Sequence, residues 1–272
     1  MLKKFILHTI LIFTAISMLA PFLVMVLISI STSNQISFND INGTLQHLTL
    51  NNYVHVNNTI PIIRYFFNSL IVSIFTTLGQ IIISTLAGYA FARLDFKFRN
   101  TLFFIILITM FIPPQVNIIP LFFIMRELHL VDTYAALILP GIFGGFGVFL
   151  MRQHFLSFPK ELEDASIIDG CNKLQMFIKI VCPLATPAIA TLGIFTFITS
   201  WNSFIWPLII TNSEAMRTLP LGLAIFKGSY REVIVWGDLL ACSVICTIPA
   251  ILIFLIGKKY IINDMMKGGV KE

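Results

Sequence analysis

The feature that most constrains this chain is a set of six long runs that contain no charged residue. A helix needs about 20 residues, mostly apolar, to cross the hydrocarbon core of a bilayer, and each run has room for one such helix. The composition agrees, because 57% of the 272 residues are hydrophobic and 11% are charged, which is unlike a soluble domain. We therefore predict an all-α membrane protein with six transmembrane helices in a single domain over residues 1–272. The uncharged runs are Phe5–Ile30, Tyr65–Ala92, Asn100–Met125, Thr133–Met151, Ile180–Ser213 and Leu239–Gly257.

Within these runs we place the spans at about residues 8–30, 66–91, 101–125, 133–151, 184–210 and 239–257. The first run follows Lys3 and Lys4, as the core of a secretory signal would. However, its 26 residues exceed the usual apolar core of a signal, and no clear cleavage site of small residues follows. We predict that this helix is retained.

The distribution of lysine and arginine predicts the orientation, because cytoplasmic loops carry the excess of basic residues. With both termini in the cytoplasm, 13 of the 18 basic residues lie inside and five lie outside. The five are Arg64, Arg126, Arg217, Lys227 and Arg231. The net charge of +5 follows from this asymmetry and gives no support to nucleic-acid binding, which needs a basic patch on a soluble face.

The uncharged runs argue against several kinds of chemistry. Proton-coupled carriers usually need ionisable groups at membrane depth, and a membrane-embedded hydrolase needs paired carboxylates.

Cys242 and Cys246 lie one helical turn apart, but no histidine or carboxylate joins them at ligand spacing, so buried thiols fit better than a metal pair. We predict no metal and no cofactor. The chain also lacks a phosphate-binding loop, so active transport by this chain would need energy from another subunit.

The predicted cytoplasmic loop, residues 152–183, concentrates charge in an otherwise apolar chain. Residues 160–179 carry seven charges. Pro159 and the acidic residues after it favour a helix start, Gly170 favours a left-handed helix end, and Asn172 can cap a second helix. We therefore predict two short helices that are divided at Gly170.

This loop also contains an unusual number of large apolar side chains. A solvated connector is the ordinary interpretation of a charged loop. Exposing so many large apolar side chains is unfavourable, however, and favours burial against a peripheral cytoplasmic protein. The side chains concerned are Leu162, Ile167, Ile168, Leu174 and Phe177.

The segment "PKELEDASIIDGCNKLQMFIKIVCP" resembles the cytoplasmic EAA loop of ATP-binding-cassette importer permeases. That pattern has Glu-Ala-Ala, then Asp-Gly, then a proline. Here the core is Asp164, Ala165 and Ser166, and Asp169, Gly170 and Pro183 follow. Aspartate keeps the charge and serine keeps the small volume, while Cys182 replaces the usual leucine before the proline.

The resemblance extends from Asn51 to the C-terminus. The segments "NSLIVSIFTTLGQIIISTLAGYAFARLDF", "TMFIPPQVNIIPLFFI", "FTFITSWNSFIWPLIIT" and "RTLPLGLAIFKGSY" are similar to the carbohydrate branch of these permeases. Within that branch the chain resembles the second, smaller membrane subunit of maltose and oligosaccharide importers.

This resemblance implies a set of partners and a role for the loop. A homologous second permease, two ATP-binding subunits, an extracellular solute-binding protein and a sugar substrate are expected, in a bacterial or archaeal plasma membrane. ATP would be bound by the partner subunits, so this chain would not be an enzyme, and alternating access would carry the sugar inward. The residues expected to couple to an ATP-binding subunit are Glu163, Asp164, Ala165, Ser166, Asp169 and Gly170.

Candidates for a translocation path are uncharged polar or aromatic residues in the spans: Asn68, Asn117, Trp201 and Asn202. Hydrogen bonding between helices is the alternative role of the asparagines, and anchoring at the membrane interface is that of Trp201 and Trp206. The segment Glu214–Asp238 is too interrupted for a span and is expected to meet the solute-binding protein. Two alternatives remain: a permease for another solute such as glycerol phosphate, or a stand-alone secondary carrier.

Overall fold

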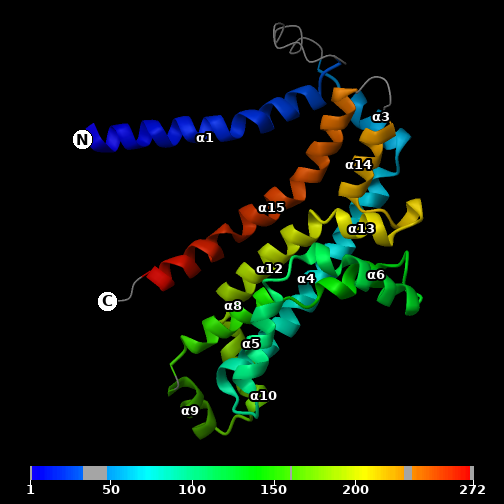
Figure 1. Ribbon diagram of the computed structural model, residues 1–272. Helices are drawn as coiled ribbons and strands as arrows, with labels where there is room; N and C mark the ends of the chain where they lie inside the picture. Colours follow the sequence, from blue (N-terminus) through cyan, green and yellow to red (C-terminus); the bar gives the residue numbers. More distant parts are fainter. Residues whose placement is uncertain (1, 33–47, 160, 230–234, 270–272) are drawn as a thin grey trace. The chain divides into compact units, whose positions relative to one another are not determined.

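The computed structural model describes residues 2–32, 48–159, 161–229 and 235–269. Helices make up almost all of this described part (Figure 1), and the β pairing within it is an isolated antiparallel bridge between Ser31 and Leu48. The predicted all-α class is therefore confirmed. A short helix, α3 (Asn51–Thr59), follows the bridge.

Three helices are long and apolar enough to cross a membrane: α1 (Leu2–Ser29), α4 (Ile62–Arg93) and the part Trp236–Tyr260 of α15 (Trp236–Gly269). They contain most of the first, second and sixth uncharged runs. The number of candidate spans rises to six if each of three bent helix pairs is one span.

Each of the three bent pairs has a proline at or near its break and lies in or overlaps an uncharged run to which one span was assigned. The pair with the sharpest bend consists of α5 (Arg99–Thr109) and the helices η1 (Pro114–Asn117) and α6 (Ile118–Glu127), which are bent by 94°. Pro113 and Pro114 stand at this break, and prolines cannot donate the backbone hydrogen bonds that would continue α5.

The second bent pair turns by 42°. It joins α7 (Tyr134–Ile138) and η2 (Leu139–Gly141) to α8 (Gly145–Leu156). Pro140 and Gly144 lie close to the bend.

The third bent pair contains the end of the predicted loop and the fifth span. It runs from α10 (Lys173–Met176) through a π-helix, η3 (Phe177–Val181), and α11 (Cys182–Leu184). A bend of 74° then leads into α12 (Thr186–Trp201).

The segment 184–210, predicted as one span, is not one continuous helix, because α12 ends at Trp201 and α13 (Ile205–Ile210) is separate. Pro207 explains the break, since it has no N–H to donate to the carbonyl of Ser203 and its ring crowds the preceding turn.

By its contacts the chain divides into two compact units. The first comprises Met1–Phe67 and Thr218–Pro249, and the second comprises Asn68–Arg217 and Ala250–Glu272. The first unit contains α14 (Leu219–Ser229), within the segment predicted to be too interrupted for a span. The single domain over residues 1–272 stays a prediction.

The second unit carries the candidate site. In Figure 1, α9 (Glu161–Ile168) and α10 lie at one end of this unit, α6 and α13 lie at the other, and α4 runs between these ends. One hydrophobic cluster lies near α10 and joins α4, α8, η3 and α12. Another lies near α6 and α13 and includes Val72, Met125, Ala136, Leu137 and Ile210.

Candidate coupling site

The loop predicted to dock on a partner folds as two short helices, α9 and α10, joined by a turn at Gly170, and this segment is called the hairpin below. Its first helix, α9, carries Glu161, Glu163 and Asp164 in the first turn, where acidic side chains complement the positive end of the helix dipole. Gly170 ends the helix with a φ of +77°, as predicted. Lys160, which belongs to the predicted loop, lies outside the described residues.

Two hydrogen bonds complete the C-terminal end of α9. The N–H of Cys171 donates to the carbonyl of Ser166 at 3.0 Å, and the N–H of Gly170 donates to the carbonyl of Ile167 at 3.0 Å. This is the Schellman pairing, in which a residue with positive φ lets the chain turn back and satisfy the last carbonyls of a helix.

The second helix of the hairpin begins with the predicted cap. The side chain of Asn172 accepts a hydrogen bond from the N–H of Gln175 at 2.8 Å, and the Gln175 side chain accepts one from the N–H of Asn172 at 3.0 Å. This reciprocal capping box fixes the start of α10, whose N-cap residue lies two residues after Gly170. The relative direction of α9 and α10 is thus set by local backbone chemistry.

The hairpin leaves most of its large apolar side chains exposed. Ile168 is 84% exposed, Ile167 63%, Leu174 62% and Leu162 41%. Phe177 departs from this prediction, because it is buried in the cluster that joins η3 to α4 and packs against the ring of Tyr89 at 5.1 Å. The π-helix begins at Phe177, so this residue belongs to the core beneath the hairpin.

The inner face of α9 is polar. Ser166 is 2% exposed, and its hydroxyl donates to the carbonyl of Glu163 at 2.7 Å. The carboxylate of Glu163 lies 3.1 Å from Nε of Arg93, at the end of α4. Of the six candidate coupling residues, Glu163 and Ser166 therefore face the body of the second unit, whereas Asp164, Ala165, Asp169 and Gly170 are exposed.

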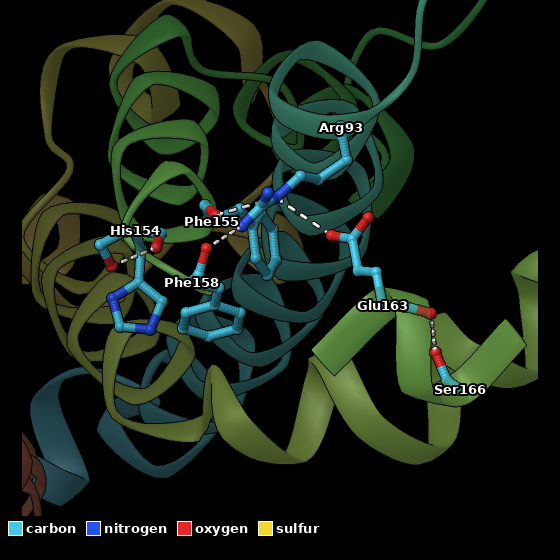
Figure 2. A network of polar contacts seen from close by, with 7 residues as sticks. Arg93, His154, Phe155, Phe158, Glu163 and Ser166 are labelled. Carbon is cyan, nitrogen blue, oxygen red and sulfur yellow. Dashed lines mark hydrogen bonds and ion pairs between the residues drawn. The ribbon is translucent and has the colours of Figure 1, made fainter. Parts of the chain in front are cut away.

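The guanidinium of Arg93 joins three segments (Figure 2). Nη2 donates to the carbonyl of Phe155 at 2.8 Å and Nε donates to the same oxygen at 3.1 Å. Nη2 also donates to the carbonyl of Phe158. Phe155 lies in the last turn of α8, where carbonyls have no partner within the helix. Arg93 therefore satisfies the end of α8 while its ion pair holds α9.

A second arginine makes the opposite contact. Arg152 of α8 donates through Nε to the carbonyl of Phe91, in the last turn of α4, at 3.2 Å. Its guanidinium also lies 4.0 Å from the centre of the Phe103 ring, a favourable cation–π arrangement. The adjacent ends of α4 and α8 are thus capped reciprocally, each by an arginine of the other helix.

Gly88 permits this close approach of α4 and α8. A Cβ atom at Gly88 would lie 2.5 Å from Cβ of Met151 and 2.9 Å from the backbone nitrogen of Arg152, which is too close for any side chain. Small residues allow helices to approach closely in membrane proteins. The backbone contact at Gly88 brings Arg93 and Arg152 within reach of the opposite helix.

The four candidate path residues fall into two groups. Asn68 and Trp201 are buried, whereas Asn117 and Asn202 are exposed at breaks between helices. The amide nitrogen of Asn68 donates to the carbonyls of Ala215 and Arg217, each at 2.8 Å, and its oxygen accepts from the hydroxyl of Tyr134 at 2.6 Å. These contacts match the hydrogen-bonding alternative for Asn68, and its place in a translocation path stays a prediction.

The two tryptophans of the fifth run also have internal contacts. The Trp201 ring stacks on Phe197, with the centroids 5.9 Å apart and an interplanar angle of 11°. The indole N–H of Trp206 donates to the carbonyl of Ala136 at 2.9 Å, close to the break between α7 and α8. Within the described residues, no group of three histidine, cysteine, aspartate or glutamate side chains is placed to hold a metal ion.

Comparison with known proteins identifies the family. The model of the family described as binding-protein-dependent transport system inner membrane component matches residues 80–267. The chain belongs to this family. It is a multi-pass membrane protein, and the EAA-type loop at residues 152–183 lies within the matched region.

Two curated relatives and one solved structure extend this result. The arabinooligosaccharides transport system permease protein AraQ of Halalkalibacterium halodurans is 38% identical over 262 residues, which cover 95% of this chain and 93% of AraQ. The sn-glycerol-3-phosphate transport system permease protein UgpE of Yersinia enterocolitica is 31% identical over 210 residues, 77% of this chain and 75% of UgpE.

The solved structure is that of a bacterial ABC transporter involved in the import of the acidic polysaccharide alginate. One of its chains superposes with a TM-score of 0.81 at 24% identity, over 95% of this chain and 96% of that chain. The fold of an ABC importer permease, predicted from the sequence, is therefore confirmed.

Arg93 and Arg152 were missed as site residues by sequence reasoning. Both stand at the ends of uncharged runs, where a basic residue is explained by membrane orientation alone. The contact of Arg93 with Glu163 joins residues that are far apart in the chain, so no local pattern marks it. The one available signal was the acidic residue Glu163 on a short helix next to a predicted membrane surface.

Proposed function

We propose that this chain is a membrane-spanning subunit of an ATP-driven sugar importer and that α9 docks on an ATP-binding subunit. The observation that carries this proposal is the exposed apolar surface of the hairpin, formed by Leu162, Ile167, Ile168 and Leu174. An exposed apolar patch on a rigid, capped element is typical of an interaction site. The lack of a phosphate-binding loop in the chain agrees with ATP hydrolysis by a partner.

The proposed assembly has a homologous second permease, two ATP-binding subunits and an extracellular solute-binding protein. Both termini and the hairpin would lie in the cytoplasm, in agreement with the basic residues of the predicted inner segments. ATP binding would draw the two docking helices of the permease pair together and switch the path from inward-facing to outward-facing. Asp164, Ala165, Asp169 and Gly170 would lie at the docking surface, since they are exposed.

Sugar is the proposed substrate class, and an oligosaccharide is favoured. The relative that matches 95% of this chain is named as a permease for arabinooligosaccharides. Glycerol phosphate is the second candidate, because UgpE is also a relative. The six uncharged runs favour a neutral substrate, since no arginine or lysine inside them could pair with a phosphate.

The docking surface is tested by charge substitution in the purified transporter. Affinity-purified wild-type protein should bring down the second permease and an ATP-binding subunit with vanadate-sensitive ATPase activity. Ile168→Glu should remove the ATP-binding subunit, because a carboxylate would be desolvated in an apolar interface. Leu128→Glu is the matched control, since Leu128 is 58% exposed but lies between α6 and α7.

The substrate and the energy source are tested in proteoliposomes. The complete transporter with its solute-binding protein should take up radiolabelled arabino-oligosaccharides in the presence of ATP and should not take up sn-glycerol 3-phosphate. Uptake of either compound by the purified chain alone, without ATP, would contradict the proposal and support a secondary carrier.

A further inference from the structure

We propose that Arg93 is a positioning residue that ties the docking helix α9 to the ends of α4 and α8, so that a displacement of α9 moves both helix ends. This inference rests on the proposed function, because it assumes that a partner acts on α9. It assigns a role to a residue outside the docking surface.

The first support is the number of groups that Arg93 holds. One guanidinium contacts the carbonyls of Phe155 and Phe158 and the carboxylate of Glu163 (Figure 2). The planar fork of arginine can serve several acceptors in fixed directions, whereas a lysine ammonium acts as a point charge. The geometry of this contact therefore couples the positions of three segments to one another.

The second support is burial. The Arg93 side chain is 7% exposed and that of Glu163 is 23% exposed. Separating a largely buried ion pair leaves two charges without compensation, so the pair stays together when its surroundings move. Glu163 and Arg93 are thus expected to move as one group.

The third support is the arrangement of α9 around this pair. Its inner face carries Glu163 and the buried Ser166, while Ile167 and Ile168 are exposed. A load applied by a partner to the exposed residues would reach Arg93 across one helix diameter. From Arg93 it would pass along its own helix, α4, and through the Phe155 carbonyl into α8.

The fourth support is the joint between α4 and α8. Arg152 caps α4, Arg93 caps α8, and the backbones meet at Gly88. Because tightly packed elements transmit displacement without absorbing it, the two helix ends respond together. Removing the Glu163 carboxylate should release α9 from this joint while leaving the reciprocal arginine caps in place.

The test uses the assembled transporter with its ATP-binding subunits and needs no sugar. Hydrogen–deuterium exchange is measured by mass spectrometry without nucleotide and with ATP plus orthovanadate. In wild-type protein we expect exchange to change in α9 and in the last turns of α4 and α8. In Glu163→Gln the change in α9 should remain, whereas the changes in α4 and α8 should fall by about twofold or more.

Glu161→Gln is the matched control, because Glu161 lies on the same helix and is exposed. It should behave as the wild type. Arg93→Lys is a second variant that keeps the charge but not the fork, and it should also weaken the response of α8. The melting temperature of each complex separates a loss of transmission from a loss of folding.

Each outcome decides one of the two proposals. The role of Arg93 would be overturned if, in the Glu163→Gln complex, ATP plus orthovanadate changed hydrogen–deuterium exchange in α4 and α8 as much as in the wild type. A Glu163→Gln complex that loses the response everywhere and melts at a lower temperature would also overturn it, since the ion pair would then be merely structural. A wild-type protein that binds no ATP-binding subunit would instead overturn the proposed function.

Discussion

Within the second unit, α4 is held near one end by the neutral amide of Asn68 and at the other end by the charged guanidinium of Arg93. Both side chains donate to backbone carbonyls outside their own helix. Asn68 satisfies Ala215 and Arg217 in an irregular segment, and Arg93 satisfies the end of α8 and the residues that follow it.

The two side chains differ in the further partner that each one binds besides the backbone carbonyls. Asn68, which is 2% exposed, is completed by the hydroxyl of Tyr134. Arg93 is completed by a carboxylate that is 23% exposed. Removing a charge from water costs far more free energy than removing an amide. An ion pair is therefore less costly where one of its partners keeps contact with water. The same need for carbonyl partners is thus met by amide chemistry at one end and by ionic chemistry at the other.

The largest expected effect is at the charged end. Arg93→Ala removes the ion pair and the side-chain donors to the carbonyls of Phe155 and Phe158, which should destabilise the protein by about 3–5 kcal/mol. Thermal unfolding of the purified protein in lipid nanodiscs measures this loss. Arg99→Ala is the control, because Arg99 pairs with the 96% exposed Asp95, and pairs of that kind contribute less than about 1 kcal/mol. Equal losses in the two variants would remove the distinction between these arginines.

The neutral end should respond less. Asn68→Ala removes the hydrogen bonds that this side chain makes with two carbonyls and with the Tyr134 hydroxyl, at a cost of about 1–3 kcal/mol. The same unfolding measurement applies, with Asn117→Ala as the control, since Asn117 is exposed. If Asn68→Ala lowered the free energy of unfolding as much as Arg93→Ala, the ionic contact would contribute no more to stability than the neutral one.

A third prediction separates backbone conformation from ionic contact at the hairpin. Nothing lies within 4 Å of a Cβ built at Gly170, so within this chain a substitution there acts through its positive φ. Gly170→Val should cost about 1–2 kcal/mol and abolish transport with normal membrane insertion. Gly170→Asn should be milder, because asparagine tolerates this conformation. Uptake by Gly170→Val at the wild-type level would show that the turn is not needed.

The smallest effect concerns Asp132, in the loop between α6 and α7. Its carboxylate accepts hydrogen bonds from the N–H groups of Asn212 and Ser213 at 3.0 and 3.1 Å. Burial raises the pKa of Asp132, but the hydrogen bonds from Ser213 and Asn212 outweigh burial and lower the pKa below its usual value of 3.8. The Asp132 carboxylate therefore stabilises the folded protein at pH values above the pKa that this group has in the unfolded chain. This stabilisation is lost as the pH falls through the lower pKa of the folded protein.

Asp132→Asn should consequently lower stability by about 0.5–1.5 kcal/mol at neutral pH. The difference from wild type should shrink when melting is repeated at about pH 3. A difference that is unchanged in acid would show that the carboxylate charge does not contribute.

The parts of the site that follow from local chemistry were predictable from the sequence. Gly170 and Asn172 were assigned as a helix end and a helix cap, and both act as predicted. The exposure of Ile167 and Ile168 also followed from their number in a short loop. In each case, the residue type fixes the backbone or the solvent contact without help from distant segments.

The parts that depend on tertiary contacts were not predictable. Helical spacing says which residues share a face, but it does not say that Glu163 points inward to Arg93. Phe177 was counted among the apolar side chains of the loop that favour burial against a partner, yet the cluster around Tyr89 buries it within this chain. Pro113, Pro114 and Pro207 mark places where helices break. The size of each bend was not predictable, because proline alone does not determine whether a helix kinks or ends.

The π-helix at Phe177–Val181 sets the angular register between the hairpin and the membrane helices that follow it. A π-helix turn holds about one residue more than an α-helical turn. If the same residues were wound as an α-helix, the additional residue would no longer be absorbed by the wider turn, and α10, with α9 attached, would rotate by about 100° relative to α11. Such a rotation would turn Glu163 away from Arg93, so the winding of this segment determines which side of α9 meets the protein and which side faces outward.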